Sequence, residues 1–208
     1  MLKNLADRWH SFIGLLTASS EAANVYSLIA DSYGQYFRYY HTLNHLDDCF
    51  KQFEAIKPEL NHPALLEYAL WFHDIVCIPN SRSNETLSAA AAAYMASILD
   101  LPVDFGNKAA DLIILTSHNG LTGCQDGAYL LDIDLAVLGR EWEGFLEYEG
   151  QIRSEYSHIN QVQYVQGRKK VLGQFLSRSA IYQTDYFREK YERTARGNLT
   201  RLNELLQA

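Results

Sequence analysis

Residues 38–58, RYYHTLNHLDDCFKQFEAIKP, are the stretch that best indicates how this chain folds. Apolar side chains recur in it at spacings of three and four, at positions 43, 46, 49, 50, 53 and 56. That period is typical of a helix with one buried face, whereas a half-buried strand alternates at every second residue. Pro58 is expected to stop this helix, because proline has no backbone N–H to donate. The stretch therefore predicts an amphipathic helix over residues 43–56.

The same helical period dominates the rest of the chain. Further helices are expected around residues 2–16, 25–29, 63–72, 84–99, 107–118, 126–138, 142–156, 161–176 and 185–206. Residues 111–116, DLIILT, have strand propensity, but their context is helical. No linker or repeat divides the sequence. We therefore predict an all-α fold: one domain over residues 1–208, a bundle of about nine helices.

Local signals refine three of these helices. Pro63 suits the first turn of its helix, and Asn84 is a candidate cap for the alanine-rich helix that follows it. The last helix, residues 185–206, is long, charged and weakly amphipathic. We expect it to lie over the surface or to form a contact in a homo-oligomer.

Composition excludes several classes of protein. The 208 residues are 48% hydrophobic, enough to bury a core without disulfides or an obligatory structural metal. The net charge of −7 argues against binding to a nucleic-acid polymer or to anionic lipid, but it allows a nucleotide held through a cation. The sequence contains no run of about 18 apolar residues, so no membrane span is expected. The first residues do not resemble a signal peptide. Cys49, Cys77 and Cys124 are few and scattered, which predicts reduced thiols in a cytoplasmic protein.

Four short segments place histidine or aspartate among apolar residues. They are RYYHTLNH with His41 and His45, LWFHDIV with His73 and Asp74, ILTSHNG with His118, and YLLDIDLAVLG with Asp132 and Asp134. Each segment alone has a structural interpretation, as a solvated helix face, a helix cap or a buried hydrogen bond. Together they supply the imidazoles and carboxylates that bind Mn²⁺, Fe, Co, Ni or Zn, whereas Mg²⁺ prefers sites richer in oxygen.

Spacing narrows the choice of ligands only in part. His41 and His45 are four residues apart and would share one helix face, so one can bind a metal while the other handles protons. Asp132 and Asp134 cannot share a helix face, so one is expected to point inward and the other to meet solvent or cap a helix. We favour Asp134 as the inward residue. Charge makes Arg38, together with Arg82 and Lys108, a candidate for contact with phosphate, although we favour a solvated surface position for each.

Several motifs in one order resemble a known family. They are YYHTLNHL, ALWFHDIV, NETLSA, LTSH and LDIDLAVLG, which span about residues 36–140. This combination resembles small bacterial proteins identified as predicted metal-dependent phosphohydrolases of the HD superfamily. The segment YHTLNH followed by LDD also resembles the YHNxxHAxD stretch of cyclic-nucleotide phosphodiesterases. The resemblance implies an HD-like helical domain with its metal-site core at about residues 36–140 and additional helices at 141–208.

The resemblance also implies roles for individual residues. The primary metal ligands would be His45, His73, Asp74 and Asp134. His41 would protonate the leaving oxygen, and Asp74 would bridge to a second metal. His118 would hold a second metal or orient substrate, and Glu85 would orient the nucleophilic water or bind a group behind the ligands. In shorter HD motifs the first histidine stands in an H[S/T]xxV context, which His41 also fits. Whether His41 or His45 binds the metal therefore stays open.

The implied activity is hydrolysis of a phosphoester in a nucleotide or another small molecule, with one or two divalent ions, Mn, Fe, Co, Ni, Zn or Mg, per site. Two other interpretations of the same residues stay open. One is a non-catalytic sensor that binds a metal and a nucleotide. The other is an all-α interaction protein whose histidines are structural.

Overall fold

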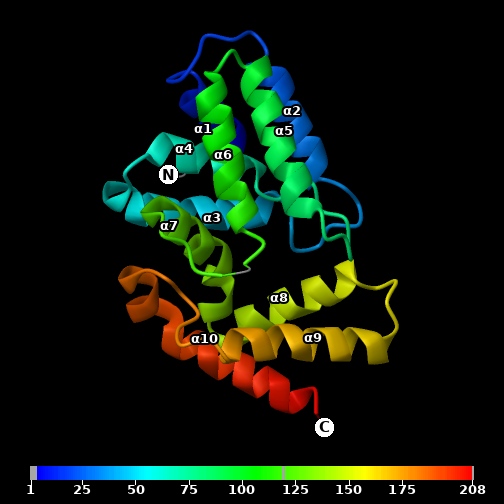
Figure 1. Cartoon of the computed structure of the whole chain (residues 1–208). Coiled ribbons are helices and arrows are strands. Elements are labelled where there is room, and N and C mark those ends of the chain that lie inside the picture. The colour runs from blue at the N-terminus through cyan, green and yellow to red at the C-terminus, as the bar shows by residue number, and fades with distance from the viewer. Residues whose placement is uncertain (1–3, 119, 208) are drawn as a thin grey trace. The chain divides into compact units, whose positions relative to one another are not determined.

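The computed structural model describes residues 4–118 and 120–207, and over these residues it is helical with no strand, which confirms the all-α prediction (Figure 1). The α-helices are α1 Leu5–Ile13, α2 Ala22–Tyr33, α3 Leu43–Ile56, α4 Pro63–Phe72, α5 Asn84–Ile98, α6 Val103–Leu115, α7 Gln125–Leu135, α8 Trp142–Glu155, α9 Gln161–Leu176 and α10 Asp185–Leu205; the 3-10 helices are η1 Lys57–Glu59 and η2 Ala136–Gly139. These ten α-helices of the described residues are close to the nine predicted.

The chain divides into two compact units, Met1–Leu130 and Leu131–Ala208. Helix α7 runs through the division between them. Each unit is described by itself below. The prediction of one domain over residues 1–208 stays a prediction.

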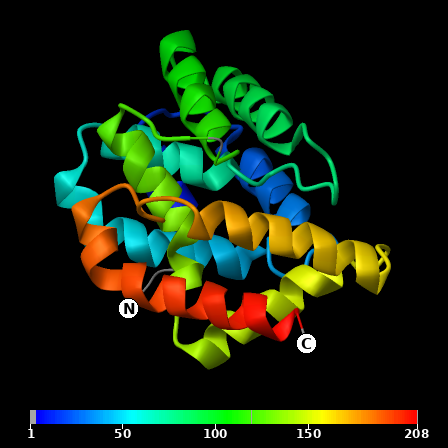
Figure 2. The same ribbon diagram turned by 60° about the horizontal axis from the view of Figure 1, so that its bottom comes forward.

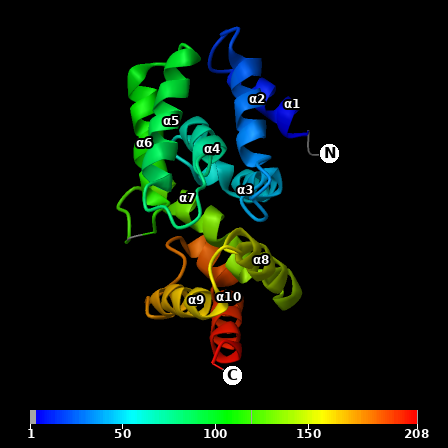
Figure 3. The ribbon, with the colours of Figure 1, turned by 90° about the vertical axis from the view of Figure 1, so that its right-hand side faces the viewer.

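In the first unit, α5 and α6 lie side by side, and both pack on α4 (Figures 1 and 3). Small residues allow this close approach. A Cβ atom added at Gly106 of α6 would lie 2.9 Å from the Cβ of Ala96 on α5, so only glycine fits there. Ala92 is also fully buried, and its carbonyl accepts a hydrogen bond from the Tyr68 hydroxyl of α4 at 2.9 Å. The alanine-rich sequence of α5 thus forms one side of a tight helical layer.

An aromatic cluster joins α1, α3 and α4. The ring of Trp71 lies 5.3 Å from that of Trp9 and 4.6 Å from that of Phe50, measured between centroids. All three side chains are buried. Aromatic contacts of this kind bury large apolar areas and add about 0.5–1.5 kcal/mol per pair beyond that burial. The cluster therefore fixes α3, which carries His45, against α4, which ends directly before His73.

The start of α4 is held by a buried carboxylate. Asp126 accepts hydrogen bonds from the backbone N–H groups of Asn61 at 2.9 Å and of His62, the N-cap residue, at 2.7 Å. Pro63 occupies the first turn, as predicted. Since the first N–H groups of a helix have no partner inside it, this outside acceptor replaces the missing bonds.

In the second unit, α9 and α10 lie side by side and α10 also packs on η2 (Figure 2). Gly139 of η2 touches Tyr191 of α10, where an added Cβ would come within 2.5 Å of the tyrosine Cβ. The buried residues of α10 are Phe187, Ala195, Asn198, Leu199 and Leu202. The last helix therefore contributes one face to the core of its unit, and a contact between copies of the chain stays a prediction.

Two expectations from composition can be compared with the fold. None of the three cysteines forms a disulfide. Within the described part of the chain, every helix is too short or too polar to cross a membrane.

Candidate metal centre

The predicted ligands lie at the ends of two helices. His45 is in the first turn of α3, which begins after Thr42, the N-cap residue. Thr42 has an extended backbone (φ −116°, ψ −179°), so His41 precedes the helix. The expectation that His41 and His45 share a helix face is therefore wrong, yet their ring centroids are only 5.9 Å apart. His73 and Asp74 directly follow α4, which ends at Phe72.

Three imidazoles surround one carboxylate oxygen. Asp74 Oδ2 lies 3.2 Å from Nε2 of His73, 3.5 Å from Nε2 of His45 and 3.9 Å from Nε2 of His41. The Nε2 atoms of His45 and His73 are themselves 3.1 Å apart. Four residues that the sequence singles out are thus brought together in the first unit.

These distances can be compared with those in a coordination sphere. Two ligand atoms about 2.1 Å from one cation, at angles of about 90–109°, lie about 3.0–3.4 Å apart. The separations among His45, His73 and Asp74, from 3.1 to 3.5 Å, are close to that range, whereas His41 is more distant. The first three residues therefore fit a metal ion, and His41 lies beside them.

A hydrogen bond behind His73 sets the orientation of its ring. Nδ1 of His73 lies 2.8 Å from the carbonyl oxygen of Leu70, and a carbonyl can only accept, so Nδ1 carries the proton. In the neutral imidazole the lone pair is then on Nε2, the atom that faces Asp74 and His45, whereas in the protonated ring Nε2–H donates to Asp74. Histidines that bind metals are commonly held by such a bond to their second nitrogen.

Electrostatics keep Asp74 ionised. Burial by itself would raise the pKa of this carboxyl group, but the charges of His73 and His41 and hydrogen bonds from His45 and His73 outweigh burial and hold the pKa well below its usual value. A carboxylate must be deprotonated to bind a metal, so Asp74 is in the required form at neutral pH.

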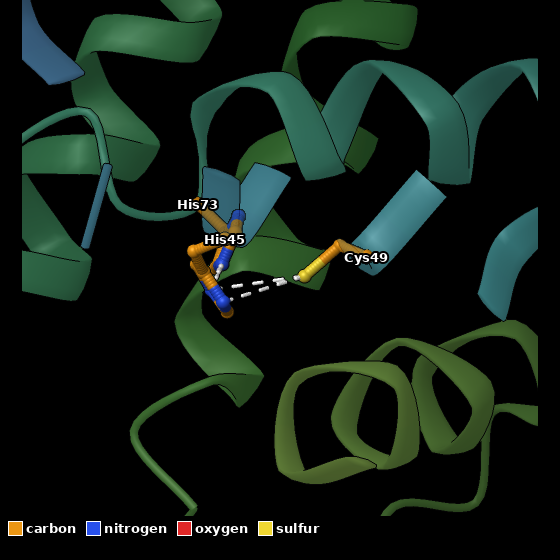
Figure 4. A group of neighbouring side chains, drawn as sticks. All are labelled: His45, Cys49 and His73. Atoms are coloured by element: carbon orange, nitrogen blue, oxygen red, sulfur yellow. Dashed lines mark hydrogen bonds between the residues drawn. The ribbon is translucent and has the colours of Figure 1, made fainter. Parts of the chain in front are cut away.

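Cys49 also borders this cluster, although its sequence context predicts an apolar helix position and a reduced thiol but no ligand. Figure 4 shows its sulfur directed at His45, with His73 beyond. The sulfur lies 3.7 Å from Nε2 and 3.8 Å from Nδ1 of His45. One potential ligand atom from each of His45, Cys49 and His73 lies within 4.8 Å of the others. The spacing of four residues from His45 on one helix was the available signal. The structure therefore contains buried His and Cys groups that are within range to hold a metal ion.

Arg38, a candidate for phosphate contact, has a different role in the structure. It is only 6% exposed, and it donates to backbone carbonyl oxygens of Asp74 at 2.6 Å, Ile75 at 2.8 Å and His41 at 3.3 Å. Its guanidinium group is thus occupied by the chain itself. It ties the segment before α3 to the turn after α4. No sequence signal identifies this role, because all three acceptors are backbone atoms.

The NETLSA segment supports the chain after Asp74. Ser88 Oγ accepts from the Val76 N–H at 3.1 Å and lies 3.4 Å from the Val76 carbonyl. Asn84 accepts from the N–H of Ile78 and donates to its carbonyl, both at 3.0 Å. The prediction that Asn84 caps α5 is wrong: Ser83 is the N-cap residue, and the Asn84 side chain bonds to the preceding loop.

Two other predicted site residues stay outside the cluster. His118 follows α6 with a left-handed backbone (φ 53°), and its N–H donates to the Leu115 carbonyl at 3.0 Å. Glu85 is half-buried in the first turn of α5. Among the residues that the structure describes, neither belongs to a group of potential ligands within 4.8 Å of one another. Their proposed roles stay predictions.

The second unit separates the two aspartates of YLLDIDLAVLG. Asp132 is fully buried and accepts hydrogen bonds, each 2.7 Å, from the Gln183 N–H and from the N–H and hydroxyl of Thr184, which caps α10. Asp134 is half-buried further along α7. It lies near Tyr148, whose pKa is raised by burial first and also by the negative charges of Glu149 and Asp134. Asp132 therefore holds a helix end, and Asp134 as a metal ligand stays a prediction.

Replacing Asp132 by alanine is expected to lower the free energy of unfolding by about 2 kcal/mol, because three partly buried donors lose their buried acceptor. Metal content per folded molecule is expected to stay at the wild-type level. Urea unfolding and metal analysis of the same sample would measure both. Loss of metal at unchanged stability would contradict this assignment of Asp132.

Comparison with known proteins adds no family to this geometry, because no family model, curated protein or solved structure matches the chain.

Proposed function

We propose that this chain is a metal-dependent phosphohydrolase of the HD type, acting on a phosphoester of a nucleotide or another small molecule. The observation that carries the proposal is the convergence of three imidazole nitrogens on one ionised carboxylate oxygen, from His41, His45 and His73 onto Asp74. The resemblance of the motifs to HD phosphohydrolases gives the reaction class.

His45, His73 and Asp74 are the residues that would hold the ion, and the resemblance adds Asp134 as a fourth ligand. His45, His73 and Asp74 together offer two nitrogen ligands and one carboxylate. This mixture favours Mn, Fe, Co, Ni or Zn over Mg. When bound, such an ion activates water near neutral pH and polarises a phosphoryl group. The centre would hold one or two ions. The distances favour His45 over His41 as the ligand, because Nε2 of His45 is nearer to Asp74 Oδ2 and also lies 3.1 Å from Nε2 of His73.

His41 is then available for proton transfer. Its side chain is 25% exposed, compared with 3% for His45, and its Nε2 is 3.9 Å from Asp74 Oδ2. In its protonated form this imidazole can donate a proton to the leaving oxygen of a substrate. General acid catalysis of this kind contributes about 10²–10⁴-fold to the rate.

The charge of the chain favours a small substrate. With a net charge of −7, the surface repels long polyanions, whereas a single phosphate group can bind at a cation. Three cysteines without a disulfide fit the reducing cytosol, where we place the activity.

The experiment that tests this function starts from protein purified without added metal. Elemental analysis is expected to find a transition metal in stoichiometric amount. Hydrolysis of p-nitrophenyl phosphate and of a nucleotide panel is expected with Mn²⁺, Co²⁺ or Ni²⁺, to be lost on chelation and to return when the metal is restored. Nucleotide binding without turnover would contradict the hydrolase and favour a sensor. Protein that binds no metal would contradict both.

Metal binding is also expected to stabilise the fold. At about 100 times the dissociation constant, a metal that binds only the native state adds about 2.7 kcal/mol to the free energy of unfolding. Urea unfolding with and without Mn²⁺ would measure this gain. His73→Ala is expected to lose the gain, whereas His62→Ala, an exposed histidine at the start of α4, is expected to keep it. An equal gain in both variants would contradict the assignment of His73.

A further inference from the structure

We propose that Cys49 is a further metal ligand, which with His45 and His73 gives the centre a sulfur-containing side that selects thiophilic ions such as Zn²⁺ or Co²⁺. This inference rests on the proposed metal centre and concerns which ion the centre prefers. The motifs that resemble HD phosphohydrolases do not assign Cys49 a role.

Helix geometry brings the sulfur to the histidines. Cys49 follows His45 by four residues on α3, so the two side chains lie on the same face one turn apart. In a tetrahedral zinc site, with Zn–S about 2.3 Å and Zn–N about 2.0–2.1 Å, sulfur and nitrogen are about 3.6 Å apart. The Cys49 sulfur is 3.7 Å from Nε2 of His45, close to that separation. The sulfur is also 3.8 Å from Nδ1 of His45, so it lies beside the ring, and a rotation of the Cys49 or His45 side chain is needed for joint coordination.

The surroundings of the sulfur are those of a ligand more than those of a core side chain. Cys49, His45 and His73 are 2%, 4% and 1% exposed. A buried free cysteine usually packs as a small apolar residue. Here the sulfur instead faces the imidazole of His45, with that of His73 beyond it (Figure 4). The Nε2 atoms of these two histidines are 3.1 Å apart. Three donor groups from α3 and the end of α4 are thus gathered in a place that excludes water.

The two histidines have a hard ligand and a soft ligand as neighbours. The carboxylate of Asp74 is an oxygen ligand, which suits Mn²⁺ and Mg²⁺. The thiolate of Cys49 suits Zn²⁺ and other thiophilic ions. When such an ion binds, the S–H proton leaves to solvent and the sulfur lone pair forms the bond to the ion. An ion that prefers oxygen leaves the thiol protonated.

Titration with Co²⁺ tests this proposal, because thiolate ligation to Co²⁺ gives a charge-transfer band in the near ultraviolet. The wild type and Cys124→Ala, which changes an exposed cysteine, are expected to show the band. Cys49→Ala and the nearly isosteric Cys49→Ser are expected to bind Co²⁺ without it. Their Zn²⁺ affinity is expected to fall by at least about tenfold, a loss seen even for residues one shell further from a metal. Their Mn²⁺ affinity is expected to change little.

Each other outcome overturns the proposal in a recognisable way. Co²⁺ bound to the wild type without the band would show that Cys49 is not a ligand, while the metal centre itself would stand. A band that persists in both Cys49 variants would assign the sulfur to another cysteine. Wild-type protein that binds no Co²⁺ at all would contradict the metal centre together with this proposal.

Discussion

Replacing Asp74 by alanine is expected to abolish both metal binding and phosphohydrolase activity. The Asp74 carboxylate places one oxygen within 3.9 Å of the Nε2 atoms of His41, His45 and His73. Without it the imidazoles lose the negative charge that lies against them, so they bind a divalent cation much more weakly. We expect metal affinity to fall by more than about 100-fold, the upper end of losses seen for residues beyond the ligands themselves.

Two conservative changes make this result specific. Asp74→Asn keeps the shape and one oxygen but removes the charge, and we expect it to lose the metal as well. Asp111→Asn makes the same chemical change at an exposed position of α6 and is expected to keep metal and activity. Elemental analysis and turnover of p-nitrophenyl phosphate would be measured on all three proteins. Full activity in metal-free Asp74→Ala protein would rule out the proposed chemistry.

Replacing Arg38 by methionine is expected to lower the free energy of unfolding by about 3 kcal/mol. Methionine retains much of the apolar stem but leaves three backbone carbonyl oxygens, of His41, Asp74 and Ile75, without the charged donor they share. Unsatisfied buried acceptors cost about 1–3 kcal/mol each, and partial access of water reduces the sum. Urea unfolding measures the change.

The same substitution is expected to weaken metal binding, because Arg38 positions the segments that carry His41 and Asp74. Arg82→Met, in the exposed loop before α5, is the matched control and is expected to change stability by less than about 0.5 kcal/mol. Arg38→Lys keeps the charge but cannot reach three carbonyls at once, so only part of the stability should return. A loss in Arg38→Met no greater than that in Arg82→Met would show that the buried guanidinium does not support this turn.

Helices were predictable because their signals are local. The period of three and four predicts α3 and α9 at the bounds observed, and the first-turn position of Pro63 is confirmed. The failures come from contacts across the chain. Asn84 has the composition of a helix cap, yet its side chain bonds to Ile78 six residues earlier. An asparagine side chain can bond either to the first N–H groups of its own helix or to the backbone of a nearby loop. The sequence does not show which of these groups lies closer.

The site was predictable to the extent that its residue types are chemically unusual in their surroundings. Histidine and aspartate in an apolar context indicated His45, His73 and Asp74, which the structure brings together. The role of Arg38 could not be inferred, because backbone carbonyls leave no mark in the sequence. The sequence did not indicate Cys49 as a potential metal ligand for a different reason. Cysteine fits an apolar helix position as well as a ligand position, so the apolar pattern of α3 is the same in both cases.

The two hydrogen bonds between Asn84 and Ile78 close the base of the loop between them, and this has a consequence for divergence among related sequences. The tip of that loop, at Pro79 to Arg82, lies beyond these two hydrogen bonds and turns through Asn80, which has a left-handed backbone. Insertions or deletions at the tip should therefore be absorbed there without displacing the end of α4, next to His73 and Asp74. The length and composition of this loop tip could therefore change in evolution to suit different substrates, while the proposed metal centre stays unchanged.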